Sequence, residues 1–116
     1  MGRDYTRQEL LIEAAAAAAT LLEVGGRGDL RRFSDDEVFR YAVAYLWLRL
    51  AEPTCQLVTR RLVGGDAQVN WDGMCRLRNI LAHDRDEDID YRSLWAGLST
   101  TLVGIGAQAD RLLAVD

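Results

Sequence analysis

Apolar residues recur along the chain every three or four positions, which is the spacing of amphipathic helices. No segment alternates apolar and polar residues as a half-buried strand does. The pattern predicts an all-α protein, folded as an antiparallel bundle of four to five helices in one domain over residues 1–116. Its clearest stripe follows Asp90, a predicted N-cap, and consists of Leu94, Leu98, Leu102, Ile105, Ala109 and Leu112.

Two capping boxes mark predicted helix starts. The first is Thr6-Arg7-Gln8-Glu9, and Gly25 and Gly26 are expected to end the helix that it begins. The second is Ser34-Asp35-Asp36-Glu37, which precedes a helix with apolar residues on more than one side. This second helix is expected to contact neighbours on two sides.

The middle of the chain contains three further boundary signals. Pro53 is expected to kink or restart the second helix, because proline lacks an amide hydrogen and clashes with the preceding turn. Gly64 and Gly65 are expected to end it. Asn70 is the predicted cap of a third helix that ends near His83.

Composition narrows the possible chemistry. The net charge is -4, and all 14 basic residues are arginine, which excludes mechanisms that need a lysine. One histidine, His83, and two cysteines cannot form a Cys/His zinc site within one chain. The acidic run that follows His83 lacks the glycine and ligand spacing of an EF-hand. We therefore expect neither a metal nor a cofactor.

Cys55 and Cys75 are interpreted as reduced thiols that pack as small buried hydrophobic residues. The N-terminus does not have the pattern of a signal peptide, and no run of about 20 apolar residues predicts a membrane span. These patterns predict a cytoplasmic protein without a membrane partner. The pI of about 4.9 excludes indiscriminate binding to nucleic acid, so an RNA site requires a local arginine cluster.

Such a cluster occurs at the end of the predicted third helix, where Arg76, Arg78, Asn79 and His83 fall within eight residues. An arginine can bind two phosphate oxygens, and an imidazole can move a proton near neutral pH. Five positions separate Arg78 from His83, which on a helix is about 140° and about 7.5 Å of rise. The two side chains are therefore not stacked, but the long Arg78 guanidinium can bend towards the imidazole and leave room for a phosphate between them. The structural alternative is a histidine that only caps the helix C-terminus.

Metal-free RNA cleavage requires a base, an acid and a cation that stabilises the phosphorane. One chain has only one histidine, whereas a homodimer has two histidines and two copies of Arg78. A composite site at a dimer interface is therefore the simplest arrangement of these residues.

The run Arg78-Asn79-Ile80-Leu81-Ala82-His83 resembles the Arg-polar-x-x-x-His signature of the HEPN superfamily of helical ribonucleases. Its flanks, Trp71-Asp72-Gly73-Met74 and Ile89-Asp90-Tyr91-Arg92-Ser93-Leu94-Trp95, are similar to those of HepT-like toxins. The resemblance implies a HEPN-type bundle that forms a homodimer and cuts RNA without a metal. Arg78 and His83 would then be catalytic, Asn79 would support them, and the partner would be a cognate minimal nucleotidyltransferase antitoxin.

Well-matched HepT-like proteins have a tyrosine two residues after the histidine, which accepts AMP groups from that partner. This chain has Arg85 there, and a guanidinium offers no phenolic hydroxyl. Control by adenylylation is therefore not expected by this route. Together with Arg76, Arg85 is instead a candidate RNA-binding residue.

Two other functions remain open from the sequence. Some HEPN bundles are non-catalytic subunits that bind a nucleotide or a nucleotidyltransferase partner. The chain could also be a purely structural dimer with Tyr41, Tyr45 and Trp47 at its interface. Loss of RNA cleavage in His83→Ala would distinguish the ribonuclease from the binding subunit.

Overall fold

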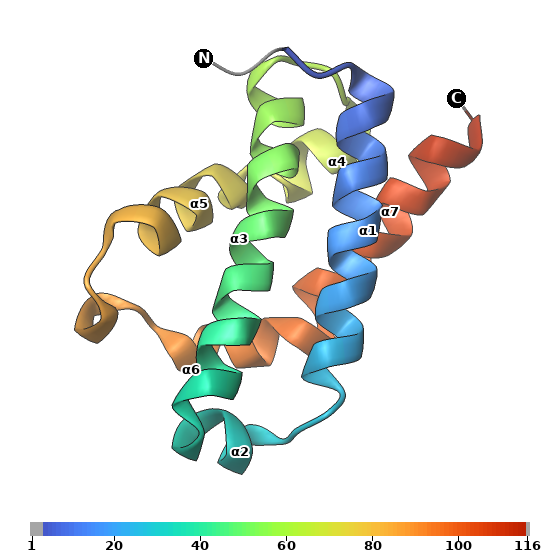
Figure 1. The fold of residues 1–116 in the computed structure, drawn as a ribbon. Coiled ribbons are helices and arrows are strands. Elements are labelled where there is room, and N and C mark those ends of the chain that lie inside the picture. The colour runs from blue at the N-terminus through green and yellow to red at the C-terminus, as the bar shows by residue number, and fades with distance from the viewer. Residues whose placement is uncertain (1–3, 116) are drawn as a thin grey trace.

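A computed structural model describes residues 4–115 of the chain, and every element in that range is helical (Figure 1). The prediction of an all-α fold is confirmed. Two 3₁₀ turns, Asp86–Asp88 and Gly97–Ser99, accompany the α-helices. The α-helices are α1 (Arg7–Gly25), α2 (Leu30–Asp35), α3 (Glu37–Thr59), α4 (Gly65–Asn70), α5 (Gly73–His83), α6 (Tyr91–Ala96) and α7 (Thr101–Val115).

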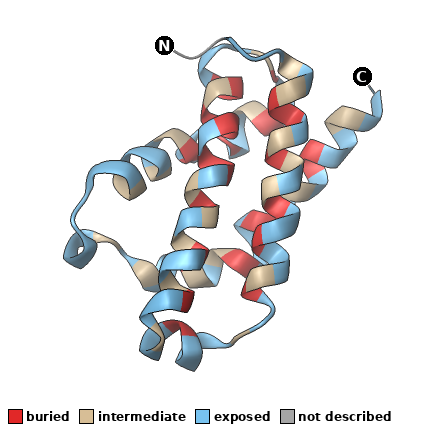
Figure 2. Cartoon of the chain, in the orientation of Figure 1, coloured by how far each residue is buried: buried red, intermediate tan, exposed pale blue. Residues whose placement is uncertain are grey.

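The long helices α1 and α3 run antiparallel and pack along their lengths (Figure 1). Helix α7 packs against α1, whereas α5 packs against α3 on the side away from α1 and α7. Buried residues line the inner faces of the three long helices, and α5 and the segment after it are largely exposed (Figure 2). None of the described helices is both long enough and apolar enough to cross a membrane.

The first capping box forms as predicted. The Glu9 amide donates to Thr6 Oγ1 at 3.1 Å, and the Thr6 amide donates to Glu9 Oε1 at 3.0 Å. Helix α1 ends at Gly25, with Gly26 as its C-cap. These reciprocal bonds satisfy two of the amides that a helix N-terminus leaves unpaired.

The second predicted start is wrong by two residues. Ser34 lies inside the short helix α2, and the N-cap of α3 is Asp36, whose Oδ1 accepts from the Phe39 amide at 3.1 Å. Both residue types are good caps, so the local sequence does not decide between them. Phe33 decides it, because α2 buries this ring against Trp95, with 5.0 Å between ring centroids.

Helix α3 does not restart at Pro53, which corrects one of the two effects predicted for this proline. Helix α3 continues through Pro53 to Thr59, and Gly64 is the N-cap of α4 instead of the end of α3. Pro53 and the two residues after it are buried. Packing of this segment holds it helical despite the hydrogen bond that proline cannot donate.

The third and fourth predicted helices have other boundaries in the structure than the sequence predicts. Asn70 ends α4 instead of capping α5, which begins at Gly73 and ends at His83 as predicted. Asp90 caps α6 as predicted, accepting from the Ser93 amide at 3.1 Å. The predicted helix after it is divided into α6, a 3₁₀ turn and α7, although the stripe from Leu94 to Ala109 is buried as expected.

Gly97 follows the end of α6 and lies against the core. A Cβ atom on Gly97 would lie 3.1 Å from Cζ2 of Trp47. Trp47 is 2% exposed, and its Nε1 donates to the Leu94 carbonyl at 3.1 Å. Trp47 therefore belongs to the core, which corrects its place in the predicted interface of a structural dimer. The other two members of that group, Tyr41 and Tyr45, are exposed.

Candidate functional site

Helix α5 places the predicted site residues on a solvent-facing surface. Met74 is buried, and Leu77 and Leu81 are half-buried against the core, which anchors one side of the helix. Arg76 and His83 lie on the opposite side, because each follows a residue of the inner side, Met74 or Leu81, by two positions, which is about 200° around a helix. Arg76, Arg78, Asn79 and His83 are all exposed.

Arg78 and Asn79 form a hydrogen-bonded pair. The guanidinium Nη2 of Arg78 donates to Oδ1 of Asn79 at 3.0 Å. Among residues 4–115, no ion pair involves Arg78 or His83, and no hydrogen bond joins the two. The guanidinium therefore keeps its charge and most of its donors available for an anion.

The two predicted RNA-binding arginines differ in their surroundings. Arg85 lies 3.5 Å from Glu87 and 3.6 Å from Asp88, so acidic neighbours in its own loop balance its charge. Arg76 is exposed on α5, and the described part of the chain gives it no acidic partner. Of the two, Arg76 has the charge more available to phosphate, whereas Arg85 would have to exchange its ion pairs first.

A cluster that sequence reasoning missed holds the acidic loop against α3. The Tyr91 hydroxyl donates to Oδ1 of Asp86, and the Tyr91 ring lies 6.3 Å from that of Tyr41. The Arg40 guanidinium carbon lies 5.5 Å from the centroid of each ring. Burial, and then the hydrogen bond to Asp86, raise the pKa of Tyr91 well above its ordinary value, so it remains a donor at neutral pH.

This cluster offered no periodic signal in the sequence, since 50 positions separate Tyr41 from Tyr91. An exposed tyrosine beside an arginine on α3 was the available hint. Its consequence for the site is that this hydrogen bond fixes the Asp86 carboxylate beside Tyr91. A carboxylate free to turn towards a bound phosphate would repel it.

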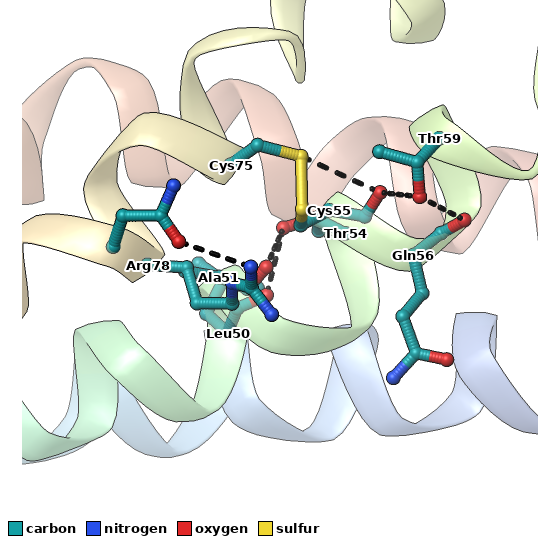
Figure 3. The surroundings of a disulfide bond; sticks show 9 residues. Leu50, Ala51, Thr54, Cys55, Gln56, Thr59, Cys75 and Arg78 are labelled. Carbon is teal, nitrogen blue, oxygen red and sulfur yellow. Dashed lines mark hydrogen bonds between the residues drawn. A yellow bond between two sulfur atoms is a disulfide. The ribbon is translucent and has the colours of Figure 1, made fainter. Parts of the chain in front are cut away.

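The interpretation of the two cysteines as reduced thiols is wrong in this structure, which joins Cys55 of α3 to Cys75 of α5 in a disulfide (Figure 3). Their Cα atoms lie 4.6 Å apart, within the range that a disulfide spans. The cysteines are 20 positions apart, so only the packing of α5 on α3 shows that they meet. Cys55 is buried as predicted, whereas Cys75 is half-buried.

The arrangement can bind an anion at Arg78, with Asn79 orienting the guanidinium and His83 at the end of the same helix able to exchange a proton. Among residues 4–115, no three His, Cys, Asp or Glu side chains are grouped so as to hold a metal ion. Comparisons of the chain with protein-family models, with curated proteins and with solved structures find no match.

Proposed function

We propose that the chain is a metal-independent ribonuclease of the HEPN superfamily, similar to the toxins of HepT-like toxin-antitoxin systems. The observation that carries the proposal is the exposed Arg78–Asn79 pair, with His83 five residues later at the end of the same helix. This arrangement has the residues of the HEPN signature accessible on one surface helix. The proposal includes a HEPN-type bundle and a homodimer.

Each residue then has a defined chemical role. A base removes the proton of a ribose 2′-hydroxyl, the 2′-oxygen attacks the adjacent phosphorus, and an acid protonates the departing 5′-oxygen. In a homodimer, His83 of one copy serves as base and His83 of the other as acid. Arg78 stabilises the charge that develops on the phosphorane, and Asn79 holds the guanidinium in place.

RNA binding would depend on a few arginines, since the chain has a net charge of -4. Arg76 is the first of these, because it is exposed on α5 beside the pair. Arg85 contributes only where RNA displaces Glu87 and Asp88 from it. Binding should therefore weaken as the salt concentration rises, but with a shallow slope, because few phosphates are neutralised.

The proposed partner is a cognate minimal nucleotidyltransferase antitoxin. Because Arg85 occupies the position of the family's acceptor tyrosine, we propose that the antitoxin controls this chain by binding to it instead of by adenylylation. We place the pair in the cytoplasm, where a disulfide such as Cys55–Cys75 is usually transient or regulatory.

The second candidate function is a non-catalytic HEPN subunit that binds a nucleotide or a nucleotidyltransferase. One observation favours it: among the described residues of the chain, no hydrogen bond joins Arg78 to His83. Arg78 and Asn79 could then hold a nucleotide phosphate while the partner performs the catalysis.

Cleavage of a labelled single-stranded RNA in the presence of EDTA tests the proposal. The wild type should cleave, and Arg78→Ala and His83→Ala should each lower the rate by about 100-fold or more. Both residues are exposed, so each variant should unfold at the wild-type urea concentration. Light scattering should give the mass of a dimer for all three proteins.

Arg111→Ala is the matched control, because it removes an exposed arginine from α7 instead of α5. It should cleave at the wild-type rate. A wild type that binds AMP without cleaving RNA would favour the binding subunit. Cleavage that persists in His83→Ala, or that requires a divalent metal, would contradict the proposed mechanism.

A further inference from the structure

The disulfide lies immediately beside the proposed site. Cys75 precedes Arg78 by three residues, which on a helix is a rise of about 4.5 Å on nearly the same side. Arg78 is among the residues that surround the disulfide (Figure 3). The only disulfide in the described chain is thus less than one turn of α5 from the guanidinium of the proposed site.

Apart from this bond, α5 is held chiefly by its packing on one neighbour, α3. Met74 is its one buried residue, and Leu77 and Leu81 are half-buried. A pocket of about 160 Å³ adjoins its inner side, where it is lined by Met74 and Leu77 together with Trp47, Leu94 and Thr101. The side chains along this edge of α5 therefore leave a hollow, and the helix has space to shift once the sulfur–sulfur bond is broken.

The two sulfurs differ in accessibility. Cys55 is 6% exposed, whereas Cys75 is half-buried, so an incoming thiolate reaches Sγ of Cys75. That attack forms a mixed disulfide on Cys75 and releases the Cys55 thiolate, which takes up a proton. A second small thiol then attacks the mixed disulfide and releases the Cys75 thiolate, which takes up a proton. The products are two protein thiols and one small-molecule disulfide. The two small thiols together lose two electrons, and the protein disulfide gains them.

We propose that Cys55–Cys75 is a redox latch on α5, opened by small thiols such as glutathione and closed by the corresponding small disulfide. The closed latch holds α5 on α3 and Arg78 in its site, and the open latch releases them. The evidence for the latch is the disulfide and the packing of α5 on α3. Its effect on RNA cleavage rests on the proposed function.

Hydrogen exchange of the folded protein, with and without reduced glutathione, tests the latch. Thiol labelling first confirms how many cysteines are free. In the wild type, reduction should raise amide exchange at residues 76–83 by about tenfold or more and leave α1 unchanged. Cys75→Ser, which keeps the buried Cys55, should show the faster exchange throughout and no response to glutathione.

Two results would overturn the latch. One is that glutathione leaves the bond intact unless the whole protein unfolds, which would make the disulfide a permanent structural link. The other is that the bond is reduced without any change in exchange at α5. Cys55→Ala provides a second opened form, in case Cys75→Ser does not fold.

RNA cleavage by the same samples separates the latch from the proposed function. Faster exchange together with a loss of cleavage on reduction, reversed by glutathione disulfide, supports both. Faster exchange with no cleavage in either state supports the latch and contradicts the ribonuclease. Equal cleavage in both states contradicts the control of Arg78 by the latch.

Discussion

Helices α3 and α5 pack against each other, yet they are stabilised in opposite ways. Ten residues of α3 are buried, from Phe39 to Val58, whereas α5 buries only Met74. Packing in the core therefore determines which side chains fit at these positions of α3. Four polar side chains of α5, Arg76, Arg78, Asn79 and His83, are exposed instead, and the proposed binding of an anion would give them a function.

The difference also separates the effects of substitution. A change in α3 or in its neighbour α1 should alter the free energy of unfolding. A change on the outer side of α5 should alter function and leave stability intact. Each of the following predictions tests that separation, beginning with the largest expected effect.

Truncation in the core should cost far more than the same truncation in α5. Leu21→Ala removes a fully buried side chain of α1 and should lower the free energy of unfolding by about 3 kcal/mol. Leu81→Ala removes a half-buried side chain of α5 and should cost about 1 kcal/mol. Urea denaturation measures both. Equal losses would show that α5 is packed as firmly as the core, and the comparison would fail.

The helical stripes that these two leucines belong to could be predicted from the sequence, because burial follows the helical period. Thr6, Gly26 and Asp90 were also identified correctly, since each acts within one turn of its helix. By contrast, the choice of Asp36 over Ser34 depends on Phe33 packing against Trp95, a residue 62 positions away. No local pattern contains that contact.

The candidate site could also be predicted only in part from the sequence. The end of α5 at His83 and the exposure of Arg78 follow from the position of the apolar residues. The disulfide and the pairing of Arg85 with Glu87 do not, because they depend on the packing angle of two helices and on the conformation of a loop. The sequence thus predicts which residues face solvent better than it predicts which of them meet.

A buried hydrogen bond joins Trp71, which lies between α4 and α5, to Gln108 of α7. Its loss should give the second largest decrease in the free energy of unfolding. The fully buried Trp71 donates from Nε1 to Oε1 of Gln108 at 2.7 Å. Trp71→Phe keeps most of the apolar volume but leaves this oxygen unpaired, which should cost about 2 kcal/mol. Adding Gln108→Leu should restore part of that loss in urea denaturation. A double variant less stable than Trp71→Phe would contradict the hydrogen bond as the cause.

The start of α3 should give a smaller, pH-dependent effect. The hydrogen bond from the Phe39 amide lowers the pKa of Asp36 below its ordinary value. The ionised Asp36 carboxylate therefore stabilises the folded chain above the pKa of an unfolded aspartate, about 4. This stabilisation is lost as the pH falls through the lower pKa of Asp36 in the folded chain.

Asp36→Asn keeps the cap without a titrating group, so its melting temperature should depend less on pH between about 5 and 2 than that of the wild type. Asp36→Ala should melt lower at neutral pH and should differ least from the wild type in acid. If Asp36→Asn followed the wild-type pH dependence, another carboxylate would be responsible for it. Calorimetry across this pH range makes the measurement.

The smallest effect on stability should come from a substitution that frees the loop after α5. It tests whether residues outside the core affect function more than stability. Tyr91→Phe removes the donor that holds Asp86 but keeps the ring beside Tyr41 and Arg40. The free energy of unfolding should change by less than about 1 kcal/mol. Amide exchange in residues 84–90 should rise, because the loop loses its bond to the bundle.

Tyr45→Phe is the matched control, since its ring is 58% exposed and lies on the same helix as Tyr41. It should leave exchange in the loop unchanged. Without the hydrogen bond from Tyr91, the Asp86 carboxylate is free to turn towards a bound phosphate, so Tyr91→Phe should also weaken binding of a short RNA. Slower exchange, or tighter binding of RNA, would mean that the cluster strains the loop instead of holding it.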